Sequence, residues 1–316
     1  LIKTYKSFVR NGANLNENDK ERLRDIDTEK AQLSLTFGEN VLKENNEFKL
    51  IIDQEKDLIG LPKSVIEAAS ISANNEGHEN KWMFTLDYPS YIPFMTYAEN
   101  RTLREQMYRA FNSKGFQENE NNNTDFVIKI ANLRAERAKL LGYKSHAHYV
   151  LEERMAKTPD NVHNFLKELL EKAKPASEKE FQNLEKFAKD LNGIEQLQKW
   201  DSGYYSEKLK KELYSFDDEQ LKPYFKLENV INGAFTVAKK LFGLHFEEIN
   251  TIDKYHEDVL TYKVIDDSGD LVSIFYADFF PRSGKRNGAW MTSFKPQMIK
   301  EGQNHRPHIS IVCNFT

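Results

Sequence analysis

Residues 271–294, LVSIFYADFFPRSGKRNGAWMTSF, constrain the fold of this chain more than any other segment. Residues 271–280 are dense in β-branched and aromatic side chains, and residues 288–294 resume an extended, aromatic-rich pattern. Between them, residues 281–284 form a Pro-Arg-Ser-Gly cluster of the kind that breaks regular structure. The pattern predicts two strands joined by a basic, glycine-flanked connection, which together form a β-ribbon.

The first of these strands is apolar on both of its faces. Successive side chains of a strand point to opposite sides, so every second residue shares a face. The two predicted faces are Ile274, Tyr276, Asp278 and Phe280 on one side and Phe275, Ala277 and Phe279 on the other. A strand that is apolar on both sides is typical of a sheet covered on both sides, so we expect the ribbon to be buried between other elements or beside a cleft.

Most of the remaining chain shows helical periodicity. Charged segments at 18–37 and 44–53 predict surface helices, interrupted at Gly38-Glu39-Asn40. Three further helices have apolar residues at three-to-four spacing, and their predicted inner faces are Leu103, Met107 and Ala110; Phe126, Ile130, Leu133 and Leu140 or Leu141; and Val230, Ala234, Val237, Ala238 and Leu241.

Short strands are predicted at 81–86, 259–265 and 308–315, and the first of them is ended by Pro89 and Pro93. The expected fold class is therefore mainly α with a small C-terminal β-sheet. We expect a mainly helical region at residues 1–250 and a β-ribbon region at 251–316, without a glycine-rich linker that would mark an independent domain.

Composition excludes several classes of partner. The formal net charge is −4 and the pI is about 6.1, which argues against nucleic acid. No run approaches the roughly 20 apolar residues that a membrane span requires, so no membrane partner is expected. The single cysteine, Cys313, cannot form an intramolecular disulfide and is expected in the core, which favours the cytoplasm. A periplasmic location stays open because the chain begins with leucine.

The histidines do not form a zinc peptidase motif. Such a site needs two histidines at positions i and i+4 of a helix with a glutamate between them. His256-Glu257 has the first two members only, because residue 260 is leucine and the segment lacks helical periodicity. We therefore predict no catalytic residue and no metal ligand in this chain, and the same holds for the other histidines considered, His146 and His148, His163, His245, and His305 and His308.

Several segments resemble the thimet oligopeptidase family of zinc metallopeptidases, and within it the bacterial peptidyl-dipeptidase (dipeptidyl carboxypeptidase) branch. The resemblance extends along most of the chain and is looser over the first fifty residues. The segments that carry it are FYADFFPRSGKRNGAWM from Phe275, LRAERAKLLGYKSHAHYVLEERMAKTPDNVHNFL from Leu133, WDSGYY from Trp200, LKPYF from Leu221 and KKLFGLHF from Lys239.

This resemblance implies a zinc-dependent enzyme with a helical, zincin-like oligopeptidase fold. In the family the zinc helix, the third ligand and the Tyr and His residues that stabilise the transition state follow the segment that corresponds to this C-terminus. The resemblance thus implies a partial chain, inactive alone, whose partners are short peptides and the remaining N- and C-terminal parts of the same peptidase. The complete protein is then expected to use zinc-activated water to release C-terminal dipeptides.

The resemblance also implies a substrate-binding segment. Gly288, Ala289 and Trp290 are expected near the zinc, where their backbone can pair with an extended peptide. Two interpretations of Gly288 stay open, since its missing side chain either allows a peptide to approach or only relieves a turn after Asn287. Asp278 is expected to be interior and paired.

The basic turn and the segment that begins at Trp200 each have a structural and a functional interpretation. The basic residues Arg282, Lys285 and Arg286 are either a peptide-carboxylate site or an exposed turn, and the exposed turn is favoured. Packing and a helix cap are expected for Trp200, Asp201, Tyr204 and Tyr205.

Two other functions stay open. One is an endopeptidase of the oligopeptidase A kind within the same family. The other is a noncatalytic helical scaffold that binds peptides and never held a metal.

Overall fold

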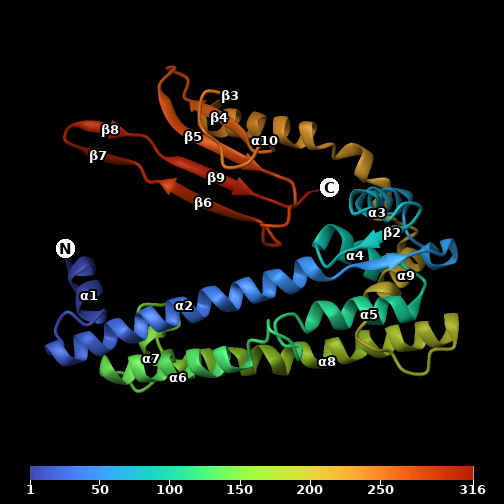
Figure 1. Ribbon diagram of the computed structural model, residues 1–316, viewed down its shortest axis with the longest axis horizontal. Coiled ribbons are helices and arrows are strands. Elements are labelled where there is room, and N and C mark those ends of the chain that lie inside the picture. The colour runs from blue at the N-terminus through green and yellow to red at the C-terminus, as the bar shows by residue number, and fades with distance from the viewer. Residues whose placement is uncertain (316) are drawn as a thin grey trace. The chain divides into compact units, whose positions relative to one another are not determined.

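The computed structural model describes residues 1–315 (Figure 1). Mainly helical elements and a small C-terminal sheet make up the chain, as predicted. Its contacts group into two compact units, which are Leu1–Phe48 with Tyr108–Tyr205 and Lys49–Met107 with Ser206–Thr316. The regions 1–250 and 251–316 were defined by secondary structure and stay a prediction.

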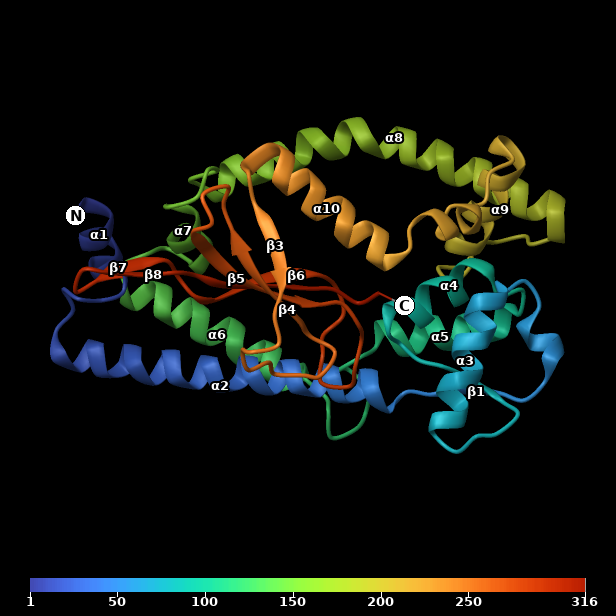
Figure 2. The ribbon, with the colours of Figure 1, turned by 90° about the horizontal axis from the view of Figure 1, so that it is seen from above.

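The first unit is helical. Its helix α2 packs along α6, and the two run side by side in Figure 2. Arg137 of α6 joins them by donating to Asp27 of α2 (Nε to Oδ1, 2.8 Å), although the guanidinium is almost fully buried. The helices of this unit are α1 (Ile2–Arg10), α2 (Glu17–Glu47), α6 (Thr124–Leu140), α7 (His146–Leu151) and α8 (Pro159–Asn192).

The predicted interruption of α2 at Gly38 is wrong, because the helix is continuous for 31 residues. Glycine within a helix costs only about 1 kcal/mol relative to alanine. Further along the helix, Glu44 makes polar contacts to the loop before α6. Glu44 is buried, accepts a hydrogen bond from the amide of Gly115 and accepts another from Asn119 (Nδ2 to Oε1, 2.7 Å).

Packing is confirmed for the tyrosine pair Tyr204 and Tyr205, which are both buried with their rings in edge contact at 5.0 Å. Asp201 is fully buried directly before α9 (Ser202–Tyr214), and its Oδ2 accepts a hydrogen bond from the amide of Gln198 at 2.9 Å. Its carboxylate therefore holds the turn that leads into the helix.

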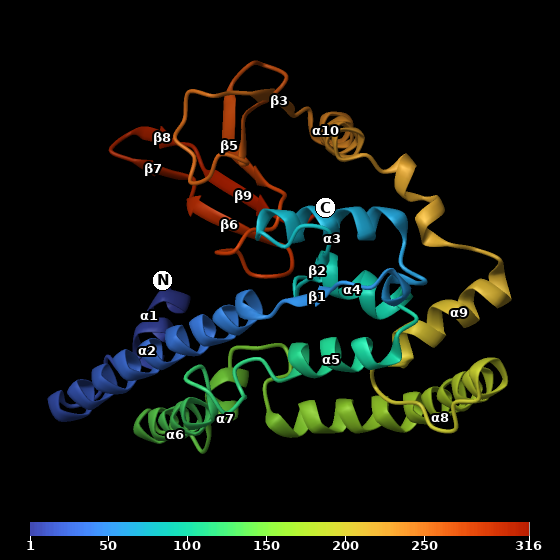
Figure 3. The same ribbon diagram turned by 45° about the vertical axis from the view of Figure 1, so that its right-hand side comes forward.

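A helical layer with a two-stranded sheet forms one part of the second unit (Figure 3). Helix α4 was not predicted, because its two prolines were interpreted as strand terminators. Pro89 lies in the first helical turn, where the missing N–H is not needed. The elements of this part are β1 (Leu50–Ile52), η1 (Glu55–Leu58), α3 (Lys63–Asn75), β2 (Trp82–Phe84) and α4 (Tyr88–Tyr97), and α5 (Arg101–Asn112) begins in this unit and ends in the first.

The other part of the second unit is a five-stranded sheet with the order β3-β4-β5-β9-β6, preceded by helices. Strands β7 and β8 form a separate hairpin. The bounds are η2 (Asp218–Gln220), η3 (Lys222–Tyr224), α10 (Leu227–Phe242), β3 (His245–Glu248), β4 (Leu260–Ile265), β5 (Leu271–Asp278), β6 (Trp290–Lys295), β7 (Met298–Lys300), β8 (Gln303–His305) and β9 (His308–Val312).

The predicted ribbon of β5 paired with β6 is wrong. Strand β9 lies between them, parallel to β5 and antiparallel to β6. The connection from Phe279 to Ala289 is irregular and far longer than a two-residue hairpin turn, so it does not force the flanking strands together. As a result, β6 is an edge strand of the sheet.

The predicted burial of the ribbon on both faces is confirmed for β5 but is wrong for β6, whose side chains are mainly exposed, and for Phe280, which is 40% exposed. On one face Phe275 lies 6.0 Å from the ring of Phe246, and Phe235 of α10 stacks on Phe246 at 4.0 Å. On the other face Ile274 and Tyr276 pack against Val259, which is fully buried.

The predicted inner face of α10 is wrong, because Val230, Val237 and Leu241 are exposed. The half-buried residues include Ile231 and Phe235, about 100° further around the helix, together with Ala238 of the predicted face. This helix is apolar around more than half of its circumference, so periodicity alone could not select the face that meets the sheet. No helix among residues 1–315 is long and apolar enough to span a bilayer.

Candidate functional site

The expected substrate-binding segment, Gly288-Ala289-Trp290, lies at the beginning of the edge strand β6. Trp290 is the first residue of β6, pairs with Val312 of β9 and has 38% of its surface exposed. Gly288 and Ala289 precede the strand. Asn314 donates from Nδ2 to the backbone oxygen of Gly288 at 2.7 Å, which fixes the position of the segment against the end of β9.

Gly288 has a φ of +107°, a backbone conformation that side chains rarely adopt. Apart from its chain neighbours, nothing among residues 1–315 lies within 4 Å of the position that a Cβ would occupy. The φ value supports the interpretation of Gly288 as a turn residue, and the open space is compatible with a peptide that approaches the backbone.

Asp278, at the end of β5, is the centre of a buried ion cluster. The residue is 1% exposed, as predicted for an interior, paired carboxylate. Arg282 donates to both of its oxygens at 2.8 Å, Lys285 donates to Oδ1 at 2.9 Å and the hydroxyl of Tyr255 donates to Oδ2 at 2.9 Å. One carboxylate therefore pairs with two cations and a phenol.

The favoured interpretation of the basic turn as exposed is wrong for Lys285, whose side chain is 2% exposed. Its ammonium also donates to the backbone oxygens of Asp278 (3.1 Å) and Phe280 (2.7 Å). The cause is Asp278, because a buried carboxylate requires paired charge. Arg282 is largely covered for the same reason, with 23% of its side chain exposed, and Arg286 is the member of the basic trio that is exposed.

The ion cluster also shifts the pKa values of its members. Burial alone would raise the pKa of Asp278, but hydrogen bonds from Arg282, Lys285 and Tyr255 outweigh it and hold the pKa at about 2. Burial and the hydrogen bond to Asp278 raise the pKa of Tyr255 to about 12. At neutral pH the carboxylate is ionised and the phenol is protonated, so the cluster positions and charges the site rather than transferring protons.

A pocket of about 540 Å³ opens beside this cluster. Sequence reasoning missed Tyr255 as one of its members, since the residue lies in a loop without periodicity. Its lining includes the side chains of Tyr255, Arg282, Lys285, Arg286, Trp290 and Phe294. The pocket therefore joins the basic turn to the edge strand.

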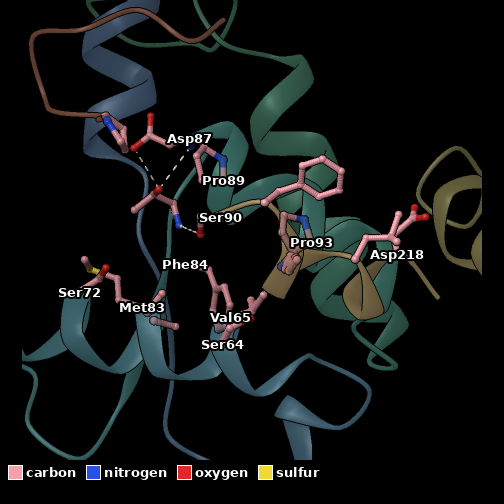
Figure 4. Close-up of a pocket in the computed structure, with 17 residues that line it drawn as sticks. Ser64, Val65, Ser72, Met83, Phe84, Asp87, Pro89, Ser90, Pro93 and Asp218 are labelled. Carbon is pink, nitrogen blue, oxygen red and sulfur yellow. Dashed lines mark hydrogen bonds between the residues drawn. The ribbon is translucent and has the colours of Figure 1, made fainter. Parts of the chain in front are cut away.

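A second pocket, of about 690 Å³, is lined by α3, β2, α4 and the η2–η3 segment (Figure 4). Its walls are mainly apolar, as Figure 4 shows for Val65, Phe84 and Pro93. Ser90 accepts a hydrogen bond from the amide of Thr85 at 2.9 Å, so this polar group serves the local fold. The pocket has the character of a hydrophobic groove.

The described residues do not fit a zinc site. Within residues 1–315 no three His, Cys, Asp or Glu side chains gather in a way that could hold a metal ion. The histidines have other contacts: His245 with Asp267 at 2.9 Å, His308 with Tyr276 at 3.2 Å and His148 with Ser145 at 2.8 Å. His305 is the last residue of β8 and His308 is the first residue of β9.

Comparison with known proteins shows that the sequence of this chain is similar to those of peptidases. The family model "Peptidase family M3" matches residues 94–316. Oligopeptidase A of Salmonella typhimurium and that of Haemophilus influenzae are each 38% identical to the chain, over 98% and 99% of it. Dipeptidyl carboxypeptidase of Escherichia coli is 32% identical over 98% of the chain.

In each of these three comparisons the chain spans 46% of the relative's length. The matched part includes the helices from α5 onward and the whole sheet with its edge strand and ion cluster. The predicted family is confirmed, and the chain belongs to peptidase family M3.

Proposed function

We propose that this chain is the substrate-supporting part of an M3 peptidase that hydrolyses short peptides. The proposal rests on the edge strand β6, which is the last strand in the order of the sheet and is preceded by Gly288 and Ala289. An edge strand has unpaired N–H and C=O groups, so an extended peptide can add to it as a further strand. Trp290 then provides an aromatic surface beside the peptide.

Two specificities fit this proposal. The oligopeptidase A relatives have the higher identity, 38% against 32%, which favours internal cleavage of oligopeptides. Release of C-terminal dipeptides is the second candidate, supported by the relative named dipeptidyl carboxypeptidase. The two differ in what closes the far end of the substrate groove.

Zinc is the proposed metal of the complete enzyme, held by residues outside this chain. We propose that the other parts of the same polypeptide are partners of the chain, because two of its helices have large exposed apolar side chains. These are Phe165, Leu166, Leu169 and Leu170 of α8 and Val230, Val237 and Leu241 of α10. A cytoplasmic location is proposed from the single unpaired Cys313.

Product mapping tests the proposed function. The complete enzyme is incubated with peptides of about ten residues whose amino termini are blocked, and the products are identified by mass spectrometry. Cleavage at internal bonds supports the oligopeptidase A kind, and successive loss of C-terminal dipeptides supports the second candidate. Intact peptides after prolonged incubation would contradict both.

Replacing Gly288 with alanine is expected to raise KM for peptides about threefold to tenfold in the complete enzyme. A Cβ at a φ of +107° strains the backbone by about 1–2 kcal/mol and displaces the segment that meets the peptide. The matched control is Gly302→Ala, because Gly302 has a φ of +74° and equally open space at the tip of the β7–β8 hairpin. Equal KM values in the two variants would remove Gly288 from substrate binding.

A further inference from the structure

The pocket beside β6 has a surplus of positive charge. Arg282, Lys285 and Arg286 are its cations, and Asp278 is the single carboxylate among its lining residues. Asp278 is already saturated, because it accepts hydrogen bonds from Arg282, Lys285 and Tyr255. The single negative charge of Asp278 therefore neutralises only part of the positive charge of the three cations that line the pocket.

Arg286 is the cation that is available to a ligand. Its neighbours Arg282 and Lys285 are both committed to Asp278, whereas no hydrogen bond or ion pair engages the Arg286 side chain within residues 1–315. Its backbone oxygen accepts from Asn314 at 3.1 Å, so the main chain at this position is fixed while the guanidinium is exposed. A fixed arginine with free donors is suited to bind a carboxylate in a bidentate geometry.

The sheet register forms one row of side chains that line the same pocket as Arg286. Asp278 of β5 pairs with Val312 of β9, and Val312 pairs with Trp290 of β6. Residues paired across strands point to the same face, so these three form a row that ends at the sheet edge. A peptide added beyond β6 would continue the row, with alternate side chains on the face that has the pocket.

We propose that this pocket is a subsite for a carboxylate-bearing side chain of the bound peptide. In this subsite Arg286 binds the carboxylate, and Arg282 and Lys285 add positive charge beside it. The proposal rests on the proposed peptidase function and adds a substrate class to it. At one position along the peptide, Glu or Asp is preferred over the isosteric amide.

The test uses the complete enzyme and internally quenched peptides that differ only by Glu or Gln at one position, scanned along the sequence. At one position the Glu peptide is expected to have a kcat/KM about fivefold to tenfold higher than that of its Gln partner, through KM. The preference should shrink as salt rises from 0.05 to 0.5 M, since screening weakens an exposed ion pair. Calorimetric titration of the same peptide pairs into the enzyme after metal removal by a chelator measures the preference independently of turnover.

Arg286→Gln should abolish the preference, and Arg286→Lys should retain part of it. The control is Arg154→Gln, which removes an exposed arginine from the other unit and should leave the preference unchanged. Equal affinities for Glu and Gln peptides at every position, or a preference that survives in Arg286→Gln, would overturn the subsite. Absence of cleavage together with a Glu preference in binding would instead overturn the proposed function and keep the subsite.

Discussion

Replacing Asp278 with alanine is expected to lower the free energy of unfolding by about 3–5 kcal/mol. The substitution leaves the Lys285 ammonium, whose side chain is 2% exposed, without its counter-charge. It also removes the bidentate partner of Arg282 and the acceptor of the Tyr255 hydroxyl. Removing one member of a buried ion pair costs more than the pair contributes, because the remaining charge stays desolvated.

The measurement is urea denaturation of the chain followed by tryptophan fluorescence and circular dichroism. Asp190→Ala is the matched control, because Asp190 is exposed on α8 and its loss should change stability by no more than about 0.5 kcal/mol. A loss below about 1 kcal/mol in Asp278→Ala would show that the cluster is not a stabilising centre.

The stability difference between the unmodified protein and Asp278→Ala is expected to decrease at acidic pH. The folded pKa of Asp278 is about 2, below its ordinary value of 3.8. A depressed folded pKa contributes stability that is complete above the unfolded pKa and is lost as pH falls through the folded pKa. The difference in the free energy of unfolding between the unmodified protein and Asp278→Ala should therefore be constant from pH 7 to 5. It should become smaller by about 2 kcal/mol on acidification to pH 2.

Replacing Phe94 with alanine is the second large perturbation, with an expected loss of about 3–5 kcal/mol. Phe94 of α4 is fully buried, and its ring meets the ring of Phe84 on β2 edge to face with centroids 4.7 Å apart. Truncation removes this contact and leaves a cavity that the surrounding helix cannot fill.

The loss should appear locally as faster hydrogen exchange of the amides of β2 and α4, because opening of this layer becomes easier. Ile92→Ala is the control on the same helix, since Ile92 is 50% exposed and its truncation should cost less than about 1 kcal/mol. Equal exchange rates in the two variants would contradict the assignment of Phe94 to the core.

Local signals predicted the helices well where one apolar face was distinct. Helix α6 begins at Thr124 and has Leu133 buried, as its spacing predicted. Helix α10 was predicted from residue 228 to residue 242 and is observed at Leu227–Phe242, but most of its predicted inner face is exposed. Which side of a helix meets the sheet is decided by long-range packing, here by Phe235 against Phe246, and periodicity has no access to it.

Strand positions were predicted better than strand pairing. The alternation of residues 271–280 located β5 and placed Asp278 inside, yet the order β5-β9-β6 depends on a strand thirty residues later in the chain. Burial of Lys285 was missed for a related reason. A lysine in a Gly-flanked turn is exposed in most proteins, and only the position of Asp278 in the folded sheet makes burial favourable.

The candidate site was accessible from sequence only in part. Gly288, Ala289 and Trp290 were identified by resemblance, and the structure places them at a sheet edge. Asn314 was missed because the predicted strand 308–315 extended through it, whereas β9 ends at Val312 and leaves the Asn314 side chain to bind the backbone oxygen of Gly288. Tyr255 gave no comparable signal, because its loop has neither periodicity nor a motif.

The central claim is that this chain supports the substrate while the metal ligands and catalytic groups lie elsewhere in the complete enzyme. The most direct test is to load the purified 316-residue chain with zinc, dialyse it against a weak chelator, and measure both zinc per chain and peptide hydrolysis. We expect zinc far below one per chain, with any residual binding no tighter than about micromolar, and no hydrolysis above buffer. One tightly retained zinc per chain, or hydrolysis that a chelator stops, would contradict the claim.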